Sequence, residues 1–216
     1  MADAESHSHT GRIEAFSDGV FAIAITLLII EVGVPDVEHG ESLGDALWRL
    51  WPSYSAYILS FITIGIYWVN HHAFFRLFHS TTHFFLMLNV WFLMAIAFLP
   101  FPTAVLGEYL KQDEHRDAAV TLYCIGLLLP AVGWFAVWIY GQYRGLLDDS
   151  LHPSYVWRSN LQYLVSVLIF AAALGVSFLN AWIALGICTV TIGVYLFPPL
   201  LKPEYLPLPT VAPPPE

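Results

Sequence analysis

The stretch from Arg12 to Glu31 constrains this chain most. It is an apolar run that carries a carboxylate near its start, and its sequence is RIEAFSDGVFAIAITLLIIE. A helix that crosses a bilayer needs about 20 mostly apolar residues. Asp18 lies in its first turns beside Ser17, and an ionisable side chain in a spanning helix is costly in lipid and usually faces protein or water. Beyond Asp18 the run is almost purely aliphatic and carries one hydroxyl, that of Thr26. This pattern indicates a helix beside an ion pathway.

Composition places the whole chain in a membrane. Of its 216 residues, 57% are hydrophobic and 12% are charged, against about 25% charged residues in a soluble domain. Six apolar runs are long enough, or nearly so, to span the bilayer. They cover about 15–34, 52–72, 84–106, 118–140, 161–179 and 181–197. We therefore predict an all-α integral membrane protein with six transmembrane helices.

The segments outside these runs are short. Residues 1–11 are expected to form a flexible cytoplasmic N-terminus, residues 12–201 the six-helix domain, and residues 202–216 a disordered, Pro-rich tail. Residues 42–51 begin with an S-x-x-D start and predict a short surface helix. Pro130, inside the fourth run, predicts a kink.

Charged residues predict the topology. Six spans put both termini on one side, and the basic residues divide five against three between the sides: Arg12, Arg76, Arg144, Arg158 and Lys202 against Arg49, Lys111 and Arg116. An excess of basic residues marks the cytoplasmic side, so we expect cytoplasmic termini and a multi-pass protein of the plasma membrane. Nine of the seventeen acids fall in the two longer outer loops. They either attract cations to the outer mouth or are ordinary solvated loop charges.

The first helix has a distinct aliphatic face. At 100° per residue, Ile23, Thr26, Leu27 and Ile30 share one side, and Phe16 continues it toward the N-terminus. Asp18 lies about 140° away from Ile23, so we expect it to face neighbouring helices. Taken alone, the aliphatic face fits lipid contact or helix packing as well as a pore. Asp18 equally fits a group near a helix N-terminus, where the dipole favours negative charge.

Three further elements give the chain a family resemblance. The pattern R-x-x-x-F-S-D, formed by Arg12, Phe16, Ser17 and Asp18, resembles the signature that opens the first helix of the transmembrane protein 175 family. Trp68 and His71 resemble the family's W-x-x-H element. Asn89 and the stretch LPFP at 99–102 resemble its third-helix motif. The later runs match the family only in number, apolarity and length.

The resemblance implies a function. Members of this family are potassium channels, and the single six-helix unit resembles the prokaryotic form, a homotetramer around a central pore. Ile23, Thr26, Leu27 and Ile30 would then line the pore, with the aliphatic side chains as a hydrophobic constriction. Arg12, Phe16, Ser17, Asp18, Trp68, His71 and Asn89 would support the pore helix. The expected partners are potassium and other monovalent cations, the lipid bilayer and further copies of the chain.

Other classes of protein have less support. A proton-coupled secondary transporter, with Asp18 and His71 as a relay, is the main alternative, and broken helices at the midplane would favour it. His71, His72, His79 and His83 lie within a short span, with His152 in the next loop on the same side. His79 and His83, four residues apart, could bind a metal on one helix face, and His71 or His72 could sense pH. No phosphate-binding or dinucleotide-binding glycine motif occurs, and no basic cluster suggests nucleic acid. We expect no cofactor and no enzymatic activity. The string TIGVY at 191–195 lies inside the last apolar run and is rejected as a selectivity filter.

Overall fold

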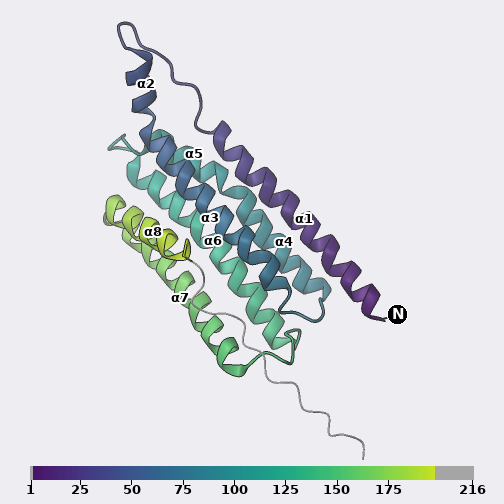
Figure 1. Ribbon diagram of the computed structural model, residues 1–216. Helices are drawn as coiled ribbons and strands as arrows, with labels where there is room; N and C mark the ends of the chain where they lie inside the picture. The colour runs from purple at the N-terminus through teal and green to yellow at the C-terminus, as the bar shows by residue number, and fades with distance from the viewer. Residues whose placement is uncertain (1, 198–216) are drawn as a thin grey trace, which may run out of the picture.

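The computed structural model describes residues 2–197, with side chains described from residue 13 onward, as a bundle of long helices (Figure 1). The helices are α1 (Ala2–Ile30), α2 (Leu43–Arg49), α3 (Trp51–Phe75), α4 (His83–Phe98), α5 (Pro100–Tyr109), α6 (Arg116–Tyr143), α7 (Pro153–Ser177) and α8 (Ala181–Tyr195). Within the described range, an isolated bridge between Phe78 and Leu147 is the only β-type pairing. The predicted all-α class is confirmed.

Five segments are long and apolar enough to cross a membrane: Ile13–Ile30, Trp51–Phe75, His83–Tyr109, Arg116–Tyr143 and Pro153–Ser177. The third of them comprises α4 and α5, which meet at Leu99 because Pro100 begins a new helix there. Pro130, by contrast, lies inside a single continuous α6. The sixth apolar run forms α8, which has only 15 residues.

The starts of two helices differ from the sequence prediction. The first helix begins at Ala2, whereas the first apolar run was expected to start at about Ala15, and α7 begins at Pro153, eight residues before the expected start at Leu161. The flexibility expected of residues 1–11 stays a prediction. The Pro-rich tail predicted for residues 202–216 lies outside the described residues.

The helices are arranged with α1 at one edge of the bundle and α7 and α8 at the opposite edge (Figure 1). α1 packs on α3, α4 and α5, whereas α8 packs on α7, α6 and α3. The start of α1 and the α3–α4 and α6–α7 loops lie at one end of the bundle, and the longer acidic loops lie at the other. This separation agrees with the division of loops predicted from the basic residues.

The centre of the bundle is aromatic and closely packed. Rings of Phe74 and Trp134 lie with centroids 4.3 Å apart, and Trp134 also contacts Phe92 at 5.5 Å. Glycines let helices approach: a Cβ placed on Gly133 of α6 would come within 3.0 Å of the Phe92 backbone in α4. Close backbone approach at small residues is the usual way in which membrane helices gain packing energy.

The α3–α4 and α6–α7 loops are joined by backbone hydrogen bonds. The N–H of His79 donates to the Leu146 carbonyl at 3.0 Å, and the N–H of Asp148 donates to the Leu77 carbonyl at 2.8 Å. The Asp148 carboxylate accepts from the hydroxyl and the N–H of Ser150, which lowers the pKa of Asp148 below its usual value. These contacts fix the spacing of α3 and α6 at this end.

Candidate functional site

The face of α1 that packs on its own bundle is narrow and regular. Ser17, Phe21, Ala24 and Leu28 recur every three or four residues, and all are buried. This spacing places them on one side of a helix. α1 is therefore attached to the bundle along a single stripe.

The opposite face of α1 is aliphatic and uncovered. The exposed fractions are 62% for Ile23, 41% for Leu27 and 69% for Ile30. Thr26 and Phe16 are exposed on the same side. The residues predicted to form one face thus do so, and in a single copy of the chain nothing among the described residues covers them.

Thr26 supplies the hydroxyl of this face. Its Oγ1 donates to the Ala22 carbonyl at 2.8 Å and also lies 3.0 Å from the Ile23 carbonyl. Because the hydroxyl proton is engaged by the helix backbone, the oxygen presents its lone pairs outward. Such an oxygen can contact a cation but has no proton to offer an anion.

Asp18 lies at the boundary between α1 and α3, as predicted from its angular offset. The indole Nε1 of Trp68 donates to its carboxylate at 3.0 Å. Among the side chains that the structure describes, Trp68 thus binds Asp18 directly. Both side chains are exposed in the single chain, so the pair lies at an edge of the protomer.

A second, buried set of polar groups lies behind Asp18. The Asn89 amide donates to the Ser17 hydroxyl at 3.4 Å, and Nε2 of His71 lies 3.3 Å from the Asn89 carbonyl oxygen. All three residues are buried. The imidazole of His71 also packs against the Phe75 ring at 4.6 Å. The chain of contacts connects α1, α4 and α3, so it fixes the position of α1 on the bundle.

Sequence analysis missed one contact. Nδ1 of His72 lies 3.1 Å from the Glu14 carboxylate. α1 and α3 run antiparallel. The residue one turn before Asp18 on α1 therefore lies beside the residue one turn after Trp68 on α3. That register was the available signal, since Glu14 precedes Asp18 by four residues and His72 follows Trp68 by four. The side chain of Arg12, predicted to support the same region, lies outside the described side chains.

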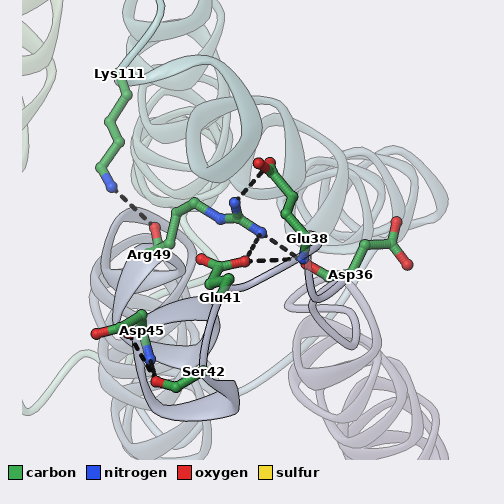
Figure 2. Close-up of polar contacts among 7 residues, drawn as sticks. All are labelled: Asp36, Glu38, Glu41, Ser42, Asp45, Arg49 and Lys111. Carbon is green, nitrogen blue, oxygen red and sulfur yellow. Dashed lines mark hydrogen bonds and ion pairs between the residues drawn. The ribbon is translucent and has the colours of Figure 1, made fainter.

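The acidic loop between α1 and α2 is organised around Arg49 (Figure 2). Its guanidinium donates to Glu38 at 2.9 Å and to the Asp36 carbonyl at 2.7 Å, and it lies 3.3 Å from Glu41. Lys111 in turn donates to the Arg49 carbonyl at 3.0 Å. Two of the acids expected to attract cations are therefore paired with a cation of the protein itself. The carboxylate of Asp36 points away from this group (Figure 2).

The histidines considered as a metal site make separate contacts in the structure. His79 contacts the Gly145 carbonyl at 3.1 Å, and His152 caps α7 by accepting from the Ser154 N–H. Among the side chains that the structure describes, no group of three or more His, Cys, Asp or Glu residues is placed to hold a metal. The string TIGVY lies within α8 and is helical, which confirms that it does not form an extended filter.

These features define a class: an all-helical, multi-pass membrane protein whose edge helix carries an uncovered aliphatic face above a polar anchor. Residues 12–100 match the family model described as "Endosomal/lysosomal potassium channel TMEM175". The chain is 41% identical over 193 residues to a protein of Chamaesiphon minutus named as a potassium channel, covering 88% of this chain and 95% of that one. The chain belongs to the TMEM175 family.

Other relatives support the same grouping. A Streptomyces collinus protein named as a potassium channel is 37% identical over 180 residues, which cover 83% of this chain and 87% of that one. The solved structure of a Chamaesiphon minutus homolog of the lysosomal potassium-selective channel TMEM175 aligns with a TM-score of 0.76 at 38% identity, covering 87% of this chain and 96% of that one. A Gallus gallus protein named as a proton channel is 37% identical over 152 residues, which cover 66% of this chain but 30% of that longer protein.

Proposed function

We propose that the chain is the subunit of a potassium-preferring cation channel that conducts passively, without enzymatic activity. Four copies would surround a central pore, with α1 of each copy lining it. Ile23, Leu27 and Ile30 would form the hydrophobic constriction, and the Thr26 oxygens would replace part of the hydration shell of the ion. The protein would lie in the plasma membrane with both termini in the cytoplasm.

The observation that carries this proposal is the two-sided character of α1. One stripe of the helix is buried against its own bundle, and the opposite aliphatic face is open at the edge of the protomer. A ring of identical subunits under cyclic symmetry brings such faces together around an axis. The potassium channels among the relatives, which align over nearly their whole length, support the assignment of the ion.

The proton-coupled transporter has less support. The helix expected to be broken, α6, is continuous through Pro130, and the break between α4 and α5 lies at Leu99, where the second helix starts within one residue. His71 contacts Asn89 and not Asp18, so the two groups suggested as a relay do not touch. The animal relatives named as proton channels make proton flux worth measuring beside potassium flux.

The test is ion flux in proteoliposomes under opposed potassium and sodium gradients. We expect non-saturating flux that favours potassium, measured with ion-sensitive dyes and with pH followed in parallel. Ile23→Asn puts a polar side chain into the proposed constriction, so cation leak should rise and the preference for potassium over sodium should weaken. Ile183→Asn is the matched control, because Ile183 is 57% exposed but lies on α8 at the other edge of the bundle.

The outcomes separate the parts of the proposal. Unchanged conductance and selectivity in Ile23→Asn would remove this residue from the constriction. Saturable counterflow that depends on a substrate would replace the channel by a transporter. A pH gradient that collapses faster than a potassium gradient would make the proton the conducted ion.

A further inference from the structure

A cavity lined by uncharged side chains lies between α3, α6, α7 and α8. Its volume is about 190 Å³, whereas a water molecule takes about 30 Å³ and an apolar cavity of about 150 Å³ is enough to bind benzene. The cavity reaches the protein surface at α3, because Ala73 lines it and is exposed. Ala73 belongs to a helix that is long and apolar enough to cross the membrane. A molecule dissolved in the bilayer can therefore reach this opening.

Aromatic rings form much of the wall of the cavity. The centroid of the Trp134 ring lies 4.3 Å from that of Phe74, 5.6 Å from that of Tyr67 and 6.2 Å from that of Tyr163. All four residues line the cavity. Because these rings pack against one another, the wall is held in shape by the protein itself. Aromatic side chains bind a further ring in offset-stacked or edge-to-face geometry, so the wall favours a ligand that contains a ring.

The polar groups that α3 presents to the cavity are hydrogen-bond acceptors. Thr63 and Asn70 both line it. The Thr63 hydroxyl donates its proton to the Leu59 carbonyl at 2.8 Å, and the Asn70 amide nitrogen donates to the Ile66 carbonyl at 2.7 Å. These bonds within the helix leave lone pairs of the Thr63 hydroxyl oxygen and of the Asn70 amide oxygen able to accept. A ligand with a hydroxyl or N–H donor can bind to either oxygen.

The absence of charge narrows the class of ligand further. No described residue that lines the cavity is charged. An ionised group at membrane depth is costly unless an opposite charge or water compensates it, so the cavity disfavours an ammonium or a carboxylate. A lipid acyl chain is neutral, but it has no donor for Thr63 or Asn70. A neutral ring compound with a hydroxyl group meets all of these conditions.

We propose that this cavity binds a neutral phenol, or a similar ring alcohol, that enters from the bilayer. Its ring packs against Trp134 and Tyr67, and its hydroxyl donates to the Asn70 amide oxygen. Asn70 is the better placed of the two acceptors, because it is half-buried and lies one turn from Ala73 at the opening, whereas Thr63 is only 5% exposed.

Photolabelling of the full-length protein in liposomes tests this site. The probe is phenol with a trifluoromethyl-diazirine group on its ring, and the matched ligand is its methyl ether, which has the same ring but no O–H. Peptide mass spectrometry locates the label. We expect saturable labelling of residues that line the cavity. The half-saturating concentration should be about twofold to tenfold higher for the ether, the factor that corresponds to one net hydrogen bond.

Three variants tie the binding to this cavity. Ala73→Trp places an indole at the opening and should reduce labelling several-fold. Ala172→Trp is the matched control, because Ala172 is exposed on α7 and does not line the cavity. Asn70→Leu removes the acceptor at similar size, so the phenol should label no better than the ether. Thermal unfolding shows which variants fold, and the comparison of phenol with ether in the unchanged protein does not depend on them.

The results that would overturn the proposal are distinct. Labelling that rises linearly with concentration, or that spreads over the lipid-exposed faces of α7 and α8, would exclude a defined site. Equal half-saturating concentrations for the phenol and its ether would also overturn it and would make the cavity a site for apolar chains. Labelling reduced as much by Ala172→Trp as by Ala73→Trp would place the bound phenol outside the cavity.

Discussion

Asp18 lies between two helices, and its environment favours a supporting role over direct contact with an ion. The carboxylate accepts from the Trp68 indole at 3.0 Å, about 140° around α1 from the aliphatic face. A charge at this depth is held by its partners, because lipid solvates it poorly. We therefore expect Asp18 to affect ion flow through the position of α1 and not through contact with the ion.

We predict that Asp18→Asn and Trp68→Phe impair assembly or opening more than they alter ion preference. Trp68→Phe removes the donor while keeping most of the apolar ring, and the lost hydrogen bond to a charged group should cost about 1–2 kcal/mol. Thermal unfolding in detergent and the potassium-to-sodium permeability ratio would be measured on the same preparations. A changed permeability ratio in a stable, correctly assembled Asp18→Asn variant would contradict this prediction.

The position of a residue could be predicted within one helix, whereas its contacts with another helix depend on the relative register of the two helices. The angular position of Ile23, Thr26, Leu27 and Ile30 followed from the helix period alone, and the structure puts all four on one exposed face. Trp68 and Asn89 could be grouped with the first helix only through the family motif. The Glu14–His72 contact needed the relative register of α1 and α3, which no periodicity within one helix contains.

At the level of elements, glycines set the distance between α3 and α5. A Cβ on Gly107 of α5 would lie 2.9 Å from the Cα of Ser53 in α3, and that atom belongs to backbone. Since backbone cannot rotate away as a side chain can, the two helices must separate or shift to admit a methyl group. The glycine thus holds α5 close to α3 near the end of the bundle that carries α2.

We predict that Gly107→Ala destabilises the protein by about 1–3 kcal/mol, the usual cost of overpacking. Gly186→Ala is the control, because an added Cβ there meets nothing within 4 Å and alanine is the better helix former by about 1 kcal/mol. The measurement is the midpoint of thermal unfolding in one detergent. A Gly107→Ala protein as stable as Gly186→Ala would show that α3 and α5 are free to separate at no cost.

Element boundaries were harder to predict than element number. The Pro at position 100 divides the third apolar run into α4 and α5, whereas Pro130 does not interrupt α6. Both prolines lie in apolar sequence, so composition alone does not distinguish the one that begins a new helix from the one that lies inside a helix. The start of α7 was missed because residues 153–160 are too polar to extend an apolar run, although Pro153 at the first helical position marks a helix start.

The whole molecule, as a single chain, leaves its edge helix incompletely covered. α1 contacts its own bundle on one side only, and the exposed side is apolar. In a bilayer, lipid could cover that face without cost, so exposure alone does not decide between lipid and a second copy. Thr26 adds an exposed hydroxyl oxygen with free lone pairs to the same face, and we expect this polar group to favour a water-filled axis between copies.

We therefore predict that the protein assembles as a tetramer whose α1 helices meet at Ile23. Native mass spectrometry of the protein released from detergent should give four times the 24.3 kDa of one chain. Oxidation of Ile23→Cys should yield covalent dimers, because a constriction brings side chains of neighbouring copies within reach of one another. Ile183→Cys, on α8 at the far edge, should remain uncoupled, and the native Cys124 and Cys188 are buried within each copy.

The mass measurement tests the number of subunits, and the cross-linking tests which face of the subunit lies at the central axis. A monomeric mass would exclude a central pore, since one aliphatic stripe cannot enclose an axis. A tetramer in which Ile183→Cys cross-links and Ile23→Cys does not would mean that each subunit faces the central axis with α8 and not with α1. The α7–α8 edge would then form the centre, and the exposed face of α1 would be a lipid-facing surface.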